Sequence, residues 1–253
     1  MILSRKNLER YSPLIVTIIM FAAWEAVARL ARIPSYILPP PSEAMMAGYE
    51  FAGPITTHAL QTLYTTLAGF ALAVIFGMLV GVIIGSSKLL YRAFYPILIG
   101  FNSVPKVALV PLLVIWFGIG TTPAIITAFL ISFFPVVVNV ATGLATIEPE
   151  LEDVLRVLGA SKATILLKVG IPNSLPYFFA SLKIAITLAF VGSVISETVA
   201  SNAGIGYLMM SASSRFNVPL VFAGLIVIAA MGIGMYALFA ALENRTTSWA
   251  FRR

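Results

Sequence analysis

From Phe51 to Ser87 the chain carries no Asp, Glu, Lys or Arg, and this run limits the possible folds more than any other feature of the sequence. A helix that crosses a bilayer needs about 20 predominantly apolar residues. Across the 253 residues, 60% are hydrophobic and 10% are charged, whereas soluble domains carry about 25% charged residues. A surface so poor in charge needs lipid as its solvent, and long apolar runs in lipid satisfy their backbone as helices. The sequence therefore predicts an all-α integral membrane protein.

Six apolar segments are long enough to cross the membrane, so we expect six transmembrane helices. The third segment contains Pro96, Pro105 and Pro111, and proline inside a helix removes a backbone donor and kinks or breaks it. We therefore expect this segment to be kinked or split. The six segments are Ser12–Leu30, Gln61–Gly85, Ala93–Phe117, Pro123–Leu144, Leu175–Val199 and Val218–Leu242.

The first segment also has an interpretation as a secretory signal peptide. Basic residues precede it, and Ala26-Val27-Ala28 resembles a cleavage site. Glu25 would stand directly before that site, however, and the remainder of the chain is plainly membranous. We therefore favour an uncleaved helix.

Proline and small residues mark two of the connections. Pro39-Pro40-Pro41 cannot lie inside a helix, so it belongs to a turn outside the membrane, and Ser42 is expected to cap a short helix that runs through Tyr49. Residues Ser201–Gly206 have the composition of a loop.

Basic residues are distributed unequally between the two sides of the membrane, and cytoplasmic segments carry the excess of Lys and Arg. If the N-terminus is cytoplasmic, the outer segments hold only Arg29, Arg32 and Arg215. The sequence therefore predicts that both termini and the polar segment Glu148–Lys168 face the cytoplasm. The inner segments then hold Arg5, Lys6, Arg10, Lys88, Arg92, Arg156, Lys162, Lys168, Arg245, Arg252 and Arg253, while Lys106 and Lys183 fall within or near spans.

Several classes of chemistry are excluded by composition. The chain has no cysteine and one histidine, His58, so we expect no metal site and no catalytic triad. Gly85-Ser86-Ser87-Lys88 contains the residue types of a phosphate loop but not its spacing, so no nucleotide or other cofactor is expected. The net charge of +6 matches a membrane surface and not a nucleic acid, because the basic residues lie between apolar runs.

The second segment carries small residues at intervals of four, which places them on one face of a helix. Such a stripe allows another helix to approach closely in lipid, and we interpret it as a packing surface. Its members are Gly69, Ala73, Gly77, Gly81 and Gly85.

The polar segment between the fourth and fifth spans predicts two short helices joined by a glycine turn. Acidic residues favour a helix N-terminus, Gly159 is a plausible C-cap, Ser161 can cap a second helix through Lys168, and Pro172 can open the next helix. Apolar residues recur at helical spacing in the first helix, and an exposed apolar stripe indicates a docking surface. The acidic residues are Glu148, Glu150, Glu152 and Asp153, and the apolar ones are Leu151, Val154, Leu155 and Leu158.

This segment resembles the cytoplasmic coupling motif of ABC importer permeases, which has the form Glu-Ala-Ala, three residues, Gly, nine residues, Ile, one residue, Leu-Pro. The chain has Asp153-Val154-Leu155, then Gly159, Val169 and Ile171-Pro172. Gly159 and Pro172 match the motif, whereas Val154 and Leu155 replace its two alanines. In that family the helix inserts into a cleft of an ATPase subunit. The coupling residues implied here are Glu152, Asp153, Val154, Leu155, Leu158, Gly159, Ala160 and Pro172.

Three further stretches resemble the branch of the family that carries nitrate, sulfonate, taurine and related solutes, and permeases for vitamin precursors look similar. They are Ile37–Ser42, Val104–Leu112 with Trp116-Phe117-Gly118, and Ser196-Glu197-Thr198 leading to Gly204–Tyr207. The resemblance implies a type I ABC importer permease in the inner membrane of a bacterial cell. It also implies two separate ATPase subunits, an external solute-binding protein and a second permease chain, expected to be a copy of this one.

On this interpretation the chain has three parts. Residues 1–56 form the N-terminal tail, first helix and outer loop, and residues 57–243 form the permease core with its coupling loop at 148–171. Residues 244–253 form a cytoplasmic tail.

Four polar residues at membrane depth are candidates for the translocation path, because charge within a span is expensive and is a functional hypothesis by default. Lys106 can attract an anionic solute, pair with a carbonyl freed by the break at Pro105, or extend to an interface. Asn102 and Asn139 can bind solute or join helices. Glu197 can help to form an outer gate or make a structural contact at a helix end, and Lys183 is expected to extend towards the cytoplasmic surface.

Two other functions compete with the permease. An ion-coupled secondary transporter often shows inverted repeats and broken helices, but we find no matching second half for the broken segment. An intramembrane enzyme needs a convergent acid, base or nucleophile, and the sequence shows no such cluster around His58.

Overall fold

The computed structural model describes residues 5–146 and 149–246, and every regular element within these ranges is a helix. The elements are α1 (Arg5–Leu30), α2 (Pro41–Glu50), α3 (Ala52–Gly85), α4 (Lys88–Ser103), the 3₁₀ turn η1 (Lys106–Leu109), α5 (Val110–Phe117), α6 (Thr121–Ala145), α7 (Pro149–Val157), α8 (Lys162–Ile165), the π-helical turn η2 (Leu166–Gly170), α9 (Ile171–Ala200), α10 (Ile205–Ser214) and α11 (Val218–Thr246).

The predicted spans are confirmed, and the third is the broken one. Five helical segments of the described chain are long and apolar enough to cross a membrane, and α4 with η1–α5 forms a sixth that is bent by 71°. Val104 adopts an extended conformation at the break, because the residue before a proline, here Pro105, is pushed out of the α-helical region.

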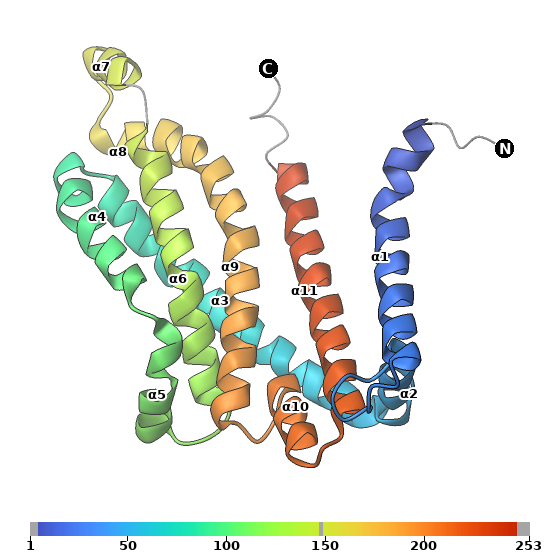
Figure 1. Cartoon of the computed structure of the whole chain (residues 1–253). Coiled ribbons are helices and arrows are strands. Elements are labelled where there is room, and N and C mark those ends of the chain that lie inside the picture. The colour runs from blue at the N-terminus through green and yellow to red at the C-terminus, as the bar shows by residue number, and fades with distance from the viewer. Residues whose placement is uncertain (1–4, 147–148, 247–253) are drawn as a thin grey trace.

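The centre of the molecule is built from α3, α6 and α9, which pack more extensively against one another than any other elements do. α3 crosses the bundle obliquely and passes behind α6 and α9 in the view of Figure 1. Its 34 residues span about 50 Å at 1.5 Å per residue, so the helix must tilt to fit a hydrocarbon core about 30 Å thick.

The small-residue stripe on α3 allows its close contact with α6. A Cβ atom added at Gly81 would lie 2.8 Å from Val140 Cβ and 2.9 Å from the carbonyl oxygen of Val137. At Gly77 the same atom would lie 2.8 Å from Val136 Cβ. The interpretation of the stripe as a packing surface is therefore confirmed.

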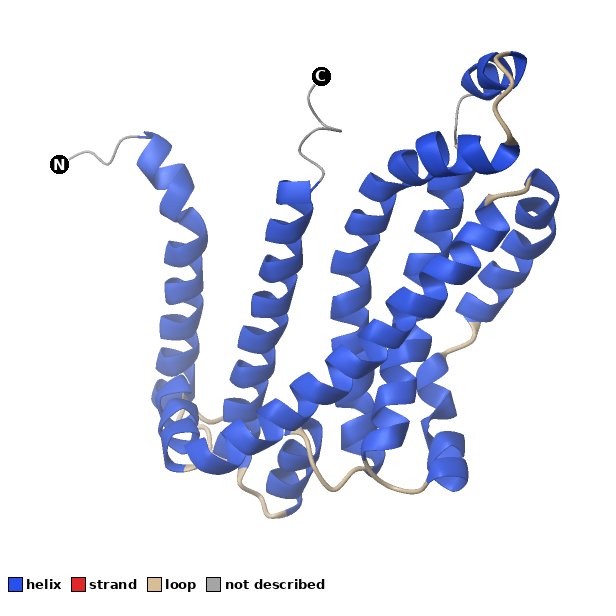
Figure 2. Cartoon of the chain, turned by 180° about the vertical axis from the view of Figure 1, so that it is seen from behind, coloured by secondary structure: helices blue, strands red, loops and turns tan. Residues whose placement is uncertain are grey.

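The two ends of the bundle differ in what covers them. α7 and α8 lie at one end, which we call the α7 end, together with the start of α1 and the end of α11 (Figure 1). α2 and α10 lie at the opposite end, which we call the α10 end, and they pack against α11 there (Figure 2). α1 stands at the edge of the bundle and meets α11 through Trp24 and Phe222, whose ring centroids are 5.3 Å apart.

Two local predictions at the α10 end were wrong. The short helix after the prolines is present, but Ser42 lies within α2 and does not cap it, because Pro40 is the N-cap. The hydroxyl of Ser42 instead donates to Glu25 Oε1 on α1 at 2.8 Å. The loop that begins at Ser201 ends earlier than predicted, because α10 starts at Ile205 and runs to Ser214.

Two predicted boundaries fall inside helices. Residue 56 lies within α3, so the predicted outer loop contributes its last residues to that helix. α11 continues to Thr246, so the predicted tail begins inside it, and residues 247–253 lie outside the described part of the chain.

Candidate functional site

The segment predicted to couple to a partner contains a defined helix–turn–helix at the α7 end. α7 closes with two backbone hydrogen bonds around Gly159: Gly159 N–H donates to Arg156 O at 2.9 Å, and Ala160 N–H donates to Leu155 O at 3.0 Å. This pair is a Schellman motif, which places its C′ residue in the left-handed region. Gly159 has a φ of 82°, which a residue with a Cβ atom rarely adopts. The predicted glycine cap is therefore confirmed.

α7 presents apolar side chains that no described residue covers. Val154, Val157 and Leu158 are 57%, 87% and 76% exposed. Asp153 is exposed on the same helix, and Leu155 is half-buried. Glu152 belongs to α7, but its side chain lies outside the described residues, as does the whole of Glu148.

The turn is joined firmly to the membrane helices on its other side. Ser161 caps α8 by accepting a hydrogen bond from Thr164 N–H at 3.2 Å, as predicted. The predicted helix end at Lys168 was wrong, because α8 ends at Ile165 and the chain continues through η2 into α9, where Pro172 lies in the first turn. Asn173 Nδ2 donates to Gly143 O near the end of α6 at 3.0 Å. A Cβ atom at Gly143 would lie 2.9 Å from Ser174 Cα, so α6 and α9 are in close contact here. A displacement of α7–α8 would therefore be passed to both helices.

Lys106 supplies hydrogen bonds to the end of the helix that precedes the break in the third span. Its ammonium donates to Asn102 O at 3.1 Å and to Asn102 Oδ1 at 2.7 Å. Asn102 O belongs to the last turn of α4, where carbonyls lack intrahelical partners, so the structure favours pairing with a freed carbonyl. Asn102 is exposed and Lys106 is partly exposed in the single chain, and the assignment of both to a path stays a prediction.

Asn139 makes its hydrogen bond within its own helix. Its Nδ2 donates to Pro135 O on α6 at 2.8 Å. This contact neither joins two helices nor engages a residue of another span, and the assignment to a path stays a prediction.

Glu197 is enclosed at the α10 end and is only 2% exposed. Its carboxylate accepts hydrogen bonds from Thr62 Oγ1 at 2.8 Å, Thr65 Oγ1 at 3.1 Å and Gly206 N–H at 3.3 Å. Thr62 Oγ1 in turn accepts from Ile205 N–H at 2.8 Å. The carboxylate thus ties α3, α9 and α10 together, and this geometry supports the structural alternative over a gate.

The side-chain partners of Glu197 were not singled out from the sequence, and neither was the contact made by His58. Ser193 lies one turn before Glu197 on α9 and makes a short hydrogen bond with Thr65. His58 Nδ1 accepts from Gly204 N–H at 3.0 Å. Thr62 and Thr65 lie on one face of α3 and Ser193 and Glu197 on one face of α9, and this spacing of polar residues in apolar helices was the available signal.

Lys183 has a partner that the sequence did not indicate, and its extension towards the cytoplasmic surface stays a prediction. It forms an ion pair with Glu243 of α11, with Nζ and Oε2 2.5 Å apart. Sequence inspection did not single out Glu243, which lies near the end of the sixth span and is buried. The pair joins α9 to α11 in a region where an unpaired charge is costly.

These features define a class of protein before any comparison is made. The described residues form a helical bundle with several membrane spans and a projecting helix whose exposed apolar side chains they do not cover. These features fit a membrane subunit that docks on a partner. The chain belongs to the family described as binding-protein-dependent transport system inner membrane component, whose model matches residues 73–248. It is therefore the permease subunit of an ATP-driven ABC importer in the inner membrane, and is not an enzyme itself.

The alignments with two transport permeases extend over nearly the whole chain. The formylaminopyrimidine transport permease protein ThiX of Halalkalibacterium halodurans is 29% identical over 97% of this chain and 98% of its own length. The taurine transport system permease protein TauC of Escherichia coli is 31% identical over 91% of this chain and 86% of its own. An inward-facing structure of the MetNI methionine ABC transporter matches with a TM-score of 0.68 over 78% of this chain and 97% of the other, at 18% identity. This last match confirms the fold.

Proposed function

We propose that α7, Gly159 and α8 form the surface through which ATPase subunits drive this permease. The observation that carries the proposal is the exposure of Val154, Val157 and Leu158 on a helix that ends in a fixed turn. Apolar side chains this exposed at the polar end of a membrane bundle are typical of a protein interface. Residues Glu152, Asp153, Leu155, Ala160 and Pro172 complete the proposed coupling segment.

The contacts around α8 indicate how movement would reach the membrane. Closure of the ATPase subunits displaces α7, and the Schellman turn carries α8 with it. Asn173 and the close contact at Gly143 connect this segment to α6 and α9, which with α3 form the centre of the bundle. Rocking of these helices switches the path between its two openings, and no covalent chemistry occurs on this chain.

We further propose that two copies of the chain enclose the path, with both termini in the cytoplasm. None of the residues of α4 or η1 is buried in the single chain, which supports a role for this side of the bundle in facing a second copy. Asn102 and Lys106 then lie near the path, whose cargo is a small solute delivered by an external binding protein. The orientation is supported by Lys88, Arg92, Lys168 and Arg245 at the α7 end against Arg29, Arg32 and Arg215 at the other.

The coupling proposal is tested by capture of the tagged full chain from mildly solubilised native membranes. Leu158→Glu places a charge on the exposed apolar surface of α7, and we expect it to remove most of the co-purifying ATPase subunit without reducing the amount of permease. Tyr36→Glu makes the same change at an exposed aromatic residue in the connection between α1 and α2 and should retain the ATPase. Equal ATPase recovery with Leu158→Glu and the wild type would overturn the proposal.

A further inference from the structure

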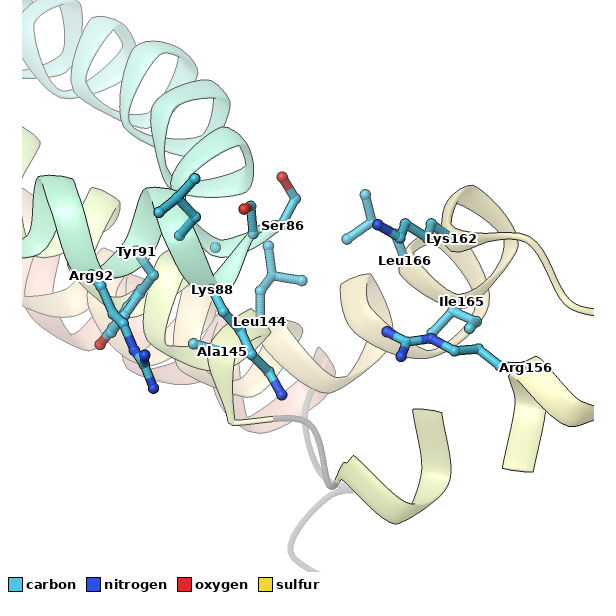
Figure 3. Close-up of a pocket in the computed structure, with 13 residues that line it drawn as sticks. Ser86, Lys88, Tyr91, Arg92, Leu144, Ala145, Arg156, Lys162, Ile165 and Leu166 are labelled. Atoms are coloured by element: carbon cyan, nitrogen blue, oxygen red, sulfur yellow. The ribbon is translucent and has the colours of Figure 1, made fainter. Parts of the chain in front are cut away.

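A basic pocket of about 560 Å³ opens at the α7 end between two parts of the chain that are far apart in sequence. One wall is the corner between α3 and α4, and the other is formed by α7 and α8 (Figure 3). Leu144 and Ala145, at the end of α6, line the space between them. The pocket is distinct from the exposed apolar residues of α7, none of which lines it.

Four cationic side chains line this pocket. Lys88 and Arg92 come from α4, one turn apart, while Arg156 comes from α7 and Lys162 from α8. Arg156 Nη1 lies 3.6 Å from Asp153 Oδ1. In the described part of the chain, no carboxylate lies within 4.0 Å of Lys88, Arg92 or Lys162. The pocket therefore concentrates positive charge that the described residues compensate only in part.

The position of the pocket limits what can occupy it. It lies where α3 ends and α4 begins, at the boundary between apolar spans and polar connections, so it is at the depth of lipid phosphate groups. Ile165 and Leu166 add apolar side chains beside the cations. Lys and Arg contributed by several elements to the walls of one pocket suit the several acceptor oxygens of a phosphate group.

We propose that this pocket binds a phosphate-bearing anion, whose source is either the headgroup of an anionic phospholipid or a soluble phosphate compound. Its place on the cytoplasmic side rests on the orientation proposed above. A bound phosphate contacts α4 and α8 at once, and so fixes the base of the coupling segment against the helix bundle.

The test measures the apparent melting temperature of the full chain, purified without ATPase in a non-ionic detergent. It is titrated with phosphatidylglycerol, with phosphatidylcholine at the same concentrations, and separately with inorganic phosphate. We expect a saturable rise with phosphatidylglycerol or with inorganic phosphate and none with phosphatidylcholine, because a ligand that binds only the folded state stabilises it. A response to phosphatidylglycerol alone identifies the lipid as the source, and a response to inorganic phosphate at similar concentrations identifies a soluble one.

The variant Lys88→Gln/Arg92→Gln should raise the half-saturating concentration about tenfold or more, since each basic residue near an anionic lipid surface contributes measurably to binding. The matched control Lys168→Gln/Arg245→Gln removes two exposed cations at the same end that do not line the pocket, and it should change the value by less than about twofold. If the double variant does not fold, Lys162→Gln tests the opposite wall.

If the pocket variant and the control lose affinity for the anion equally, the proposal is overturned, because any basic residue at this end would then attract the anion. The absence of saturable stabilisation by either anion would also overturn it. Because no ATPase is present in this assay, its outcome is independent of whether α7 docks on an ATPase subunit.

Discussion

At the α10 end, the carboxylate of Glu197 finds its hydrogen-bond partners on neighbouring helices, whereas at the α7 end α7 carries apolar side chains that no described residue covers. Glu197 is 2% exposed and accepts hydrogen bonds from α3 and α10. Leu158 is 76% exposed on a helix that makes few contacts with the bundle. The first region is buried like a protein interior, and the second is exposed like a surface that binds another protein. Substitutions in the first should therefore reduce stability, and those in the second should reduce association.

The largest loss of stability is expected from filling the contact between α3 and α6. Gly81→Leu places a side chain where even a Cβ atom meets Val140 at 2.8 Å, and overpacking of this kind costs about 1–3 kcal/mol or more. We expect little folded protein in membranes, as measured by fluorescence-detected gel filtration. Gly53→Leu, on the same helix with no atom within 4 Å of an added Cβ, is the matched control and should accumulate normally.

Removal of the carboxylate at the α10 end should have the next largest effect. Glu197→Leu leaves Gly206 N–H without its buried acceptor and removes one of several acceptors of Thr65 Oγ1, and an unsatisfied buried group costs about 1–3 kcal/mol. We expect a lower melting temperature of the purified chain, with ATPase recovery per folded permease unchanged. Glu197→Gln keeps an acceptor oxygen, so its melting temperature should fall less. A melting temperature equal to the wild type for Glu197→Leu would contradict the structural role of this residue.

The ion pair between α9 and α11 offers a smaller test of the interior. Lys183→Met leaves the buried carboxylate of Glu243 without this partner, 2.5 Å away in the native chain, and we expect a loss of about 1–2 kcal/mol. Lys183→Met/Glu243→Met removes both charges and should recover most of that loss, because two apolar side chains can replace a buried pair at little cost. If the double variant melts no higher than the single one, the two side chains are not coupled.

Gly159→Ala should have the smallest effect on stability and a clear effect on association. The φ of 82° at this position costs a residue with a Cβ atom about 1 kcal/mol, and α7 makes few contacts with the rest of the chain. The melting temperature should therefore stay close to that of the wild type, while ATPase recovery falls about fivefold, which corresponds to the same free energy. Unchanged recovery would show that the angle of the turn does not matter for docking.

The features predicted correctly from the sequence are those encoded by neighbouring residues. Apolar runs defined the spans, intervals of four defined the packing stripe, and Gly159 with Ser161 defined the turn between α7 and α8. The hydrogen bond between Thr62 and Glu197 joins residues 135 positions apart, and no local pattern indicates which residues of α3 and α9 meet. Glu243 was missed for the same reason, since its partner Lys183 lies on another helix.

Two errors at the α10 end have a common physical cause. Ser42 has the type and position of a helix cap, but its hydroxyl engages Glu25 of α1 instead, a contact that depends on how two helices meet. α10 begins in a segment rich in small residues because Gly204 and Gly206 allow close contact with Glu197. In both places tertiary contacts outweigh local propensity.

The most direct test of the docking surface uses the absence of cysteine from the chain, since Val157→Cys then provides a single thiol on the exposed side of α7. Labelling by a membrane-impermeant maleimide is measured in inside-out vesicles with and without the ATPase subunits, and Tyr36→Cys is the control at the opposite end. The account predicts that Val157→Cys is labelled in inside-out vesicles, is protected when the ATPase is present, and is not labelled from the outer side, whereas Tyr36→Cys is labelled only from that side. Labelling of Val157→Cys at the same rate with and without ATPase, or from the outer side, would contradict the assignment of α7 as the coupling surface.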